Sequence, residues 1–127
     1  AEGVWDDLRF KDEIAKLEVD VIALEMMVLR VLSAEKSGKQ SLDIAGLLKI
    51  RGSEIQQRYS ELMMMAAGPF SLPFIQEAME AGWQGDHVGA AHCAPLASTY
   101  FNMRKTTIYG GSNEIQKNII AQQLLMS

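Results

Sequence analysis

An apolar residue recurs every three or four positions over residues 14–31, and this spacing constrains the fold more than any other feature of the chain. Side chains with this spacing lie on one face of an α-helix, where they form a seam against other helices. The seam comprises Ile14, Leu17, Val21, Leu24, Val28 and Val31. We predict a long helix over about residues 6–37, ended by Gly38 in the left-handed C-cap conformation.

A second apolar stripe predicts a second long helix, with Ser41 as its N-cap and the sequence AAGP at 66–69 as its stop. The stripe comprises Ile44, Leu48, Ile55, Tyr59, Leu62 and Ala66. Gly52 lies on the same stripe, where its missing side chain would let another helix approach closely. The three methionines of residues 63–65 point to different sides, which favours packing in the core or at a subunit interface over lining an acyl pocket. The two predicted helices form an antiparallel hairpin.

Shorter helices are predicted in the second half of the chain. Residues 69–93 are irregular and rich in proline and glycine, with one short helical piece around 73–81. Pro95 suits the first turn of a third helix that runs to about Lys105.

The last predicted helix starts at Asn113, which is a good N-cap, and Gln116 completes a capping box. Its apolar face comprises Ile115, Ile119, Ile120 and Leu124. The sequence has no strand alternation and no internal repeat. We therefore predict an all-α fold, a single up-and-down helical bundle over residues 1–127.

Composition excludes several classes of function. The formal net charge of −4 argues against nucleic-acid binding, which normally requires a basic face. No apolar run approaches the roughly 20 residues that span a bilayer, so we expect no membrane partner. The single cysteine excludes an intrachain disulfide and favours a reducing, cytoplasmic location.

The glycine pair Gly110–Gly111 is the first candidate for a binding site, because it stands directly before a helix N-terminus. Backbone N–H groups at such a position are unpaired and lie at the positive end of the helix dipole, where they attract anions. The alternative is a simple turn between two helices. Spacing alone favours the simple turn.

Other polar residues offer weaker candidates. His87, His92 and Cys93 match no standard zinc spacing, so we expect no metal site. The basic pair at 104–105 could meet a phosphate, or could complement a helix C-terminus. The acidic residues of the first helix fit a solvated face: Glu13, Glu18 and Glu25.

The segment RKTTIYGGSNEIQKNIIAQQLL at 104–125 resembles the C-terminal signature of acyl-CoA dehydrogenases. These flavoproteins remove two hydrogens from Cα and Cβ of an acyl-CoA thioester. The hairpin of residues 10–68 resembles the two central helices of the family's C-terminal bundle. The resemblance implies FAD as the cofactor, an acyl-CoA thioester as the substrate, and electron-transfer flavoprotein or a similar acceptor as a partner. It also implies a homo- or hetero-oligomer.

The same resemblance assigns roles to the turn before the last helix. Tyr109 and Gly110 would lie near the substrate thioester, and Gly111, Ser112 and Glu114 would contact the FAD. Many members carry their catalytic glutamate where this chain has Gly110, so we expect no catalytic residue within the chain. Other members place the glutamate on the first helix of the bundle, or pair a base-less subunit with a competent one.

Further departures from the family pattern set the remaining expectations. The earliest long helix resembles the second helix of the family's bundle, and MMAAG at 64–68 replaces a QIFGG-like flavin contact. The family also needs a second helical domain and a β-barrel upstream. We therefore expect a C-terminal domain of a longer flavoprotein that is inactive by itself. Related acyl-CoA oxidases and flavin monooxygenases are alternatives, as is a non-catalytic interaction module that self-associates.

Overall fold

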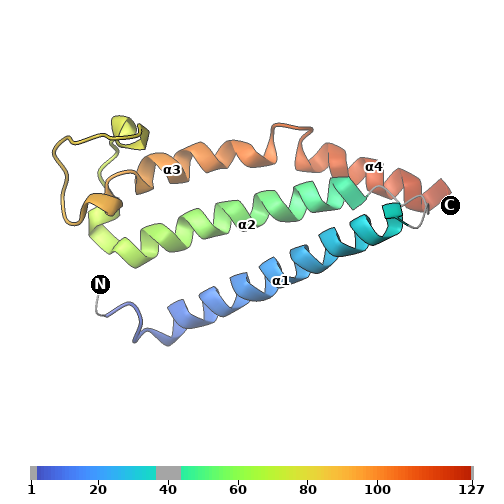
Figure 1. Cartoon of the computed structure of the whole chain (residues 1–127), viewed down its shortest axis with the longest axis horizontal. Helices are drawn as coiled ribbons and strands as arrows, with labels where there is room; N and C mark the ends of the chain where they lie inside the picture. Colours follow the sequence, from blue (N-terminus) through green and yellow to red (C-terminus); the bar gives the residue numbers. More distant parts are fainter. Residues whose placement is uncertain (1–2, 37–43, 127) are drawn as a thin grey trace.

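The chain folds into an all-α bundle, as the computed structural model of residues 3–36 and 44–126 shows (Figure 1). Its α-helices are α1 (Leu8–Lys36), α2 (Ile44–Ala67), α3 (Leu96–Met103) and α4 (Asn113–Met126). Its 3₁₀ turns are η1 (Gly68–Ser71), η2 (Gln76–Met79), η3 (Ala91–Cys93) and η4 (Arg104–Thr107). No strand occurs within these two ranges, and the predicted fold class is confirmed.

The short helical segments between α2 and α4 depart from the sequence prediction in length, and Pro95 is the N-cap of α3 rather than part of its first turn. The helical piece expected around 73–81 is the single turn η2. The third helix starts directly after Pro95, and its α-helical part ends at Met103, although η4 continues it to Thr107. The predicted caps Gly38 and Ser41 lie outside the described residues.

α2 is the central helix of the bundle. α1 packs on one side of it, while α3, η4 and α4 pack on the other. The 24 residues of α2 span about 36 Å. α3 and α4 are much shorter, so they lie end to end along α2 with the turn of residues 108–112 between them (Figure 1). This arrangement leaves that turn beside the first half of α2.

The apolar core lies between the start of α1 and the end of α2. Phe10 and Leu17 of α1 and Leu62 of α2 are buried there. Partly buried apolar side chains surround these three: Val4, Ile14, Ile55 and Ala66. Trp5 adds an edge-to-face contact with Phe10, with ring centroids 5.8 Å apart.

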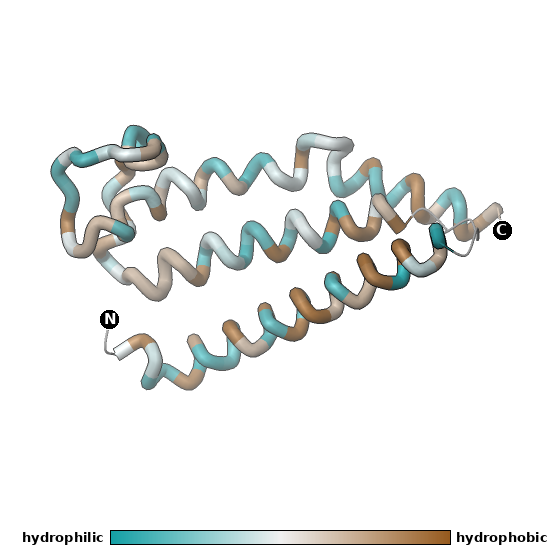
Figure 2. Tube along the Cα trace, in the orientation of Figure 1, coloured by the Kyte–Doolittle hydropathy of each residue, from teal (hydrophilic) through white to brown (hydrophobic). Residues whose placement is uncertain are grey.

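Only part of the predicted α1 seam faces α2. Leu17, Leu24 and Val31 are buried or half-buried, whereas Val21 is 45% exposed and Val28 39% exposed, so the prediction was wrong for those two valines. A straight helix drifts by about 20° per seven residues relative to such a repeat. Because α1 packs mainly against α2 among the described elements, it buries a narrow face. The second half of α1 is rich in apolar residues (Figure 2), and many of their side chains are exposed.

The predicted stripe on α2 also needs two corrections. Tyr59 is 58% exposed, and the buried positions include Ile50, Ser53 and Ser60, because α2 has neighbours on two sides. A Cβ atom on Gly52 would meet nothing within 4 Å, so this glycine permits no close approach. The close approach is at Gly46, where a Cβ would lie 2.7 Å from Oε1 of Gln116 on α4.

Ion pairs connect α1 to α2. Arg58 of α2 pairs with Glu13 of α1, and Arg51 of α2 pairs with Asp20 of α1 at 2.5 Å. The prediction of a solvated Glu13 was therefore wrong, because its carboxylate is half-buried and also accepts a hydrogen bond from Lys16. Glu18 and Glu25 are exposed, as expected.

Removing the Glu13 carboxylate should make stability less sensitive to acid. Arg58 donates a hydrogen bond to Glu13 and Lys16 donates another, and both lower the pKa of this carboxyl below its ordinary value. Such a group stabilises the fold above its unfolded pKa of about 4.3, and that contribution is lost as the pH falls through the lower folded-state pKa. In urea titrations, Glu13→Gln should be less stable than wild type at neutral pH, and the gap should close in acid. Glu18→Gln is the control; a gap that stays constant for Glu13→Gln would contradict the prediction.

None of the helices in the described part of the chain is both long and apolar enough to cross a membrane.

Candidate functional site: the glycine turn before the last helix

The turn between η4 and α4 depends on two glycines in left-handed conformations. Gly110 has a φ of 67° and Gly111 a φ of 83°, values that residues with a Cβ adopt at a cost. Ile108, Tyr109 and both glycines are exposed to solvent. The backbone of the turn is thus open on its outer side, where a ligand can approach it closely.

The cap of α4 lies one residue earlier than the sequence predicted. The Ser112 hydroxyl accepts a hydrogen bond from the N–H of Ile115 at 3.4 Å, and the Ser112 carbonyl accepts from the N–H of Gln116 at 3.0 Å. The Gln116 side chain donates to the carbonyl of Gly110 at 3.1 Å. The predicted capping box of Asn113 and Gln116 was therefore wrong, and Ser112 is the N-cap.

Asn113 instead anchors α4 to α2. Its side chain is buried; Lys49 Nζ donates to its Oδ1 at 2.7 Å, and its Nδ2 donates to the Ser53 hydroxyl at 3.1 Å. Ser53 in turn donates to the carbonyl of Ile50 at 2.8 Å. A buried carboxamide without such partners would cost stability, so this contact defines where α4 starts relative to α2.

Glu114 presents an ionised carboxylate in the first turn of α4. Its pKa is lowered, first by a hydrogen bond from its own backbone N–H and second by one from the Ser112 hydroxyl, while Lys117 and Lys49 add attraction. Position at the helix N-terminus favours the same charge state. The carboxylate is exposed and can accept hydrogen bonds from a ligand.

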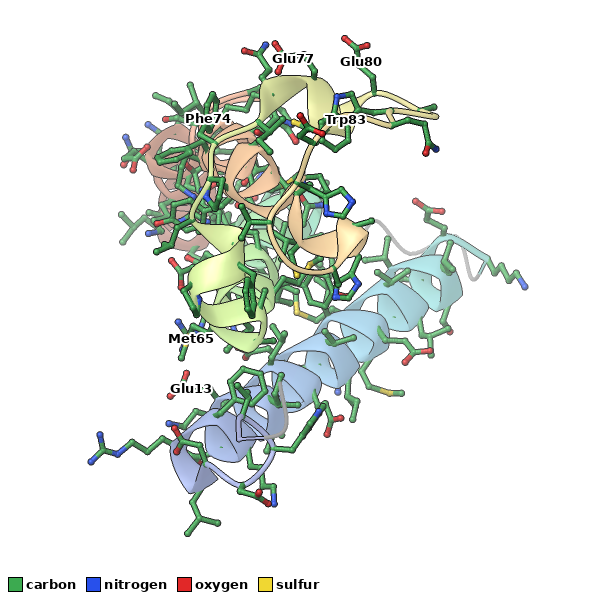
Figure 3. All side chains as sticks on the ribbon, turned by 90° about the vertical axis from the view of Figure 1, so that its left-hand side faces the viewer. Glu13, Met65, Phe74, Glu77, Glu80 and Trp83 are labelled. Atoms are coloured by element: carbon green, nitrogen blue, oxygen red, sulfur yellow. The ribbon has the colours of Figure 1, made fainter. Side chains whose placement is uncertain are left out.

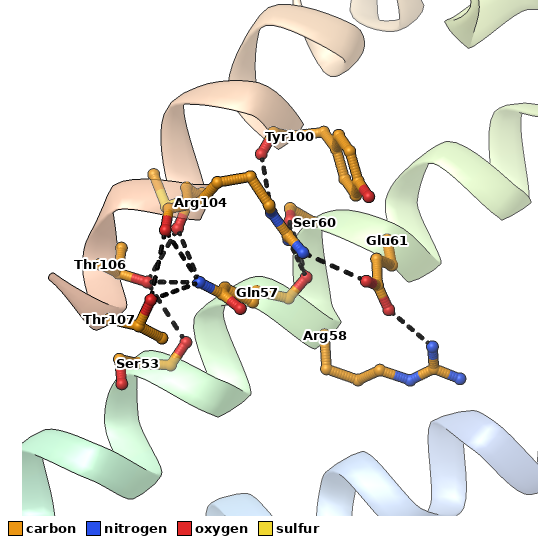
Figure 4. A network of polar contacts seen from close by, with 10 residues as sticks. Ser53, Gln57, Arg58, Ser60, Glu61, Tyr100, Arg104, Thr106 and Thr107 are labelled. Carbon is orange, nitrogen blue, oxygen red and sulfur yellow. Dashed lines mark hydrogen bonds and ion pairs between the residues drawn. The ribbon is translucent and has the colours of Figure 1, made fainter. Parts of the chain in front are cut away.

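Arg104 anchors the other side of the turn (Figure 4). Its guanidinium donates to the carbonyl of Gln57 and to the hydroxyl of Ser60, each at 3.0 Å, and pairs with Glu61 at 3.2 Å. The Nε atom donates to the carbonyl of Tyr100 at 3.3 Å, and the guanidinium carbon lies 4.2 Å from the centroid of the Tyr100 ring. These contacts favour the helix-terminus role over the phosphate role for Arg104.

The residues that hold the turn were missed at the sequence level. Lys49, Ser53 and Gln57 recur every four residues along α2, so they share one face of that helix. A polar stripe of this spacing beside an apolar stripe is the signal that would have revealed them. The five residues assigned by the family resemblance lie together in the exposed turn and the start of α4: Tyr109, Gly110, Gly111, Ser112 and Glu114.

An apolar hollow of about 640 Å³ lies at the other end of α2, away from the glycine turn. Trp5, Met63, Phe70 and Cys93 are among the residues that line it. The irregular segment beside it carries Phe74 and Trp83, with Glu77 and Glu80 pointing outward (Figure 3).

The candidate metal ligands do not converge within the described ranges. His87 Nδ1 lies 3.1 Å from the carbonyl of Gly89, and Cys93 is a buried free thiol. No group of three or more His, Cys, Asp or Glu residues is placed to hold a metal ion in the part of the chain that the structure describes.

A side chain at Gly111 should destabilise the chain, whereas one at Gly52 should not. Gly111→Ala combines a φ of 83° with a Cβ only 2.6 Å from Nε2 of Gln116, which we expect to cost about 1–2 kcal/mol of unfolding free energy. Gly52→Ala meets no atom within 4 Å inside a helix and should stabilise the chain by about 0.4–1 kcal/mol. Urea unfolding measures both changes. Equal effects of the two substitutions would show that the left-handed turn is not required.

The fold and this turn together define a helical-bundle domain whose last helix starts directly after an exposed turn formed by two glycines. A family model described as "Acyl-CoA dehydrogenase, C-terminal domain" matches residues 4–125. The chain therefore belongs to the acyl-CoA dehydrogenase family, through its C-terminal domain. Comparisons with curated proteins and with solved structures gave no match.

Proposed function

We propose that this chain is the C-terminal helical domain of an FAD-dependent acyl-CoA dehydrogenase, which removes hydrogen from Cα and Cβ of an acyl-CoA thioester. The observation that carries the proposal is the family match, which spans both the α1–α2 hairpin and the glycine turn. Residues 1–127 would then form one domain of a longer flavoprotein. The other domains would complete the flavin and substrate sites, and electron-transfer flavoprotein or a similar acceptor would take the electrons. The cytoplasmic location expected from the single cysteine stays a prediction.

The turn would contribute contacts to both ligands. Tyr109 and Gly110 would face the thioester, and Gly111, Ser112 and Glu114 would face the flavin. The exposed backbone at the two glycines supports this role, because no Cβ covers it. The ionised Glu114 carboxylate supports it as well, since it would accept hydrogen bonds from hydroxyl groups of the adenosine portion. Bound FAD would supply the hydride-accepting chemistry.

The proton acceptor would come from outside the turn. Gly110 has no side chain to reach the α-proton of a thioester, and general-base catalysis requires hydrogen-bonding distance. In this proposal the base belongs to another segment of the complete protein or to a partner subunit, and the domain alone does not turn over.

The proposal is tested with the longest natural polypeptide that contains this chain. We expect a flavin absorption band in the purified protein, and bleaching of that band without oxygen on addition of one member of a panel of acyl-CoA thioesters. A flavin that never bleaches with any thioester would support a base-less subunit. Absence of flavin, even after added FAD, would overturn the proposal.

A pair of matched variants tests the assignment of Glu114. Glu114→Gln should weaken FAD binding about tenfold, because it removes a charged hydrogen-bond acceptor. Glu77→Gln, in η2 at the end of α3 away from the turn, should leave FAD affinity unchanged. Equal affinities for the two variants would remove Glu114 from the flavin site.

A non-catalytic interaction module is the second candidate. The second half of α1 exposes a broad apolar face, with Ile22 56%, Met26 52%, Leu29 51% and Leu32 50% exposed. Large exposed apolar patches mark interaction sites. The mass of the purified chain in solution, measured over a range of concentrations, tests this role: association would support it, and a monomer throughout would contradict it.

A further inference from the structure

We propose that Gln57 of α2 is a positioning residue for the glycine turn, and this inference rests on the proposed flavin function. Its side-chain nitrogen lies within hydrogen-bond distance of two backbone carbonyls, at 3.3 Å from that of Met103 and 3.2 Å from that of Arg104. The hydroxyls of Thr106 and Thr107 lie 3.4 Å and 3.5 Å from the same nitrogen. All four groups belong to the end of α3 and to η4 (Figure 4).

The two carbonyls lie where α3 ends at Met103 and η4 begins. They accept hydrogen bonds from the hydroxyls of Thr106 and Thr107, at 2.8 Å and 3.4 Å, within the same segment, and Gln57 is their donor from another helix. The carboxamide of Gln57 brings two N–H donors to this point from a different helix. It thereby attaches the segment that leads into the turn to the face of α2.

The attachment is reciprocal between Gln57 and Arg104. The Gln57 side chain donates to the Arg104 carbonyl at 3.2 Å, while the Arg104 guanidinium donates to the Gln57 carbonyl at 3.0 Å. Thr106 is buried beside them and donates to the Met103 carbonyl at 2.8 Å. The two hydrogen bonds between Gln57 and Arg104 run in opposite directions. Together they fix the position of η4 along α2 and its rotation relative to α2.

The start of α4 is anchored on the same face of α2, one helical turn away. There Lys49 and Ser53 hold Asn113 through bonds of 2.7 Å and 3.1 Å. The turn of residues 108–112 spans these two anchors. Because both anchors are on α2, this helix sets the distance between the two ends of the turn. It thereby also sets the place where the turn meets a ligand.

Loss of the Gln57 anchor should disturb the turn more than the bundle. Gln57→Met keeps the length of the side chain and removes both donors. The matched control is Gln56→Met, because Gln56 is the adjacent residue and is exposed. Gln57→Glu, which when ionised lacks the N–H donors, is a second variant in case the methionine protein does not fold.

Amide hydrogen exchange of the full-length protein reads the position of the turn without any flavin. The N–H groups of Ile108 and Tyr109 bond to the Lys105 carbonyl at 3.0 Å and 3.3 Å, so they report on η4 and the turn. In Gln57→Met we expect these two amides to exchange about tenfold faster, while the amide of Leu17 in α1 changes little. Unchanged exchange, or the same acceleration at all three amides, would overturn the inference.

The rate of flavin bleaching by the reactive acyl-CoA measures the effect of Gln57→Met on the reaction. A displaced turn should lower the bleaching rate constant about tenfold or more at saturating thioester, with little change in the thioester concentration for half-saturation. Gln56→Met should bleach like wild type. Faster amide exchange with unchanged bleaching would overturn the positioning role. If the wild-type protein itself binds no flavin, the proposed function fails, while exchange at Ile108 and Tyr109 still decides whether Gln57 holds the turn.

Discussion

Replacement of Leu62 by alanine is expected to lower the free energy of unfolding by about 3 kcal/mol. Leu62 is only 3% exposed and packs with Phe10 and Leu17 in the one core cluster of the described residues. The substitution removes buried apolar atoms and leaves a cavity, because the surrounding structure relaxes only partly into the space. Urea unfolding followed by circular dichroism measures the change.

Leu8→Ala is the control for this substitution. Leu8 starts α1 and is 77% exposed, so its loss should change the free energy of unfolding by less than about 0.5 kcal/mol. If Leu62→Ala were no more destabilising than Leu8→Ala, the α1–α2 contact would not be the core of this domain.

Replacement of Arg104 by methionine is expected to cost about 2 kcal/mol of unfolding free energy. The buried Ser60 hydroxyl would lose the donor Arg104, and the Gln57 carbonyl would lose one donor but keep the Ser60 hydroxyl at 2.7 Å. Among the described residues, Glu61 would keep only Arg58 as its cation. The Arg104 side chain is 33% exposed, so solvent compensates part of the loss. Measurement is by urea unfolding at neutral pH.

Two further substitutions separate charge from geometry in this network. Arg104→Lys keeps the charge but cannot present a planar fork to three acceptors, so it should restore less than half of the lost stability. Arg30→Met, at an exposed position on α1, should have little effect. Full recovery in Arg104→Lys would mean that charge alone matters, contrary to the geometry of the contacts.

The helices of this chain were largely predictable from local sequence. The α1 and α2 periodicities and the stop at 66–69 match α-helices of Leu8–Lys36 and Ile44–Ala67, because a helix forms from contacts three and four residues apart. The glycine turn was equally predictable, since only glycine adopts φ values of 67° and 83° without strain.

The candidate site was predictable in its exposed part but not in its support. Residues 109–114 are neighbours in the sequence, so they necessarily lie together in the turn and at the start of α4. The supporting residues Lys49 and Gln57 lie more than 40 positions earlier, and their hydrogen bonds arise only when α2 packs beside η4 and α4. The role of Asn113 was misjudged for the same reason: as an isolated residue it suits a cap, but Ser53 and Lys49 supply stronger partners.

The sequence by itself determined that the fold is all-α, the approximate extents of the two long helices, and where the glycine turn lies, because those properties depend on interactions between near neighbours. Tertiary structure alone decided that α1 buries Leu17 and exposes Val21, that Gly46 and not Gly52 permits a close approach, and that Arg104 faces α2. Each of these depends on which helix occupies a given side of another. In this fold, α3 and α4 pack end to end on one side of α2, and α1 packs on the other side. Local periodicity does not specify this arrangement of the helices.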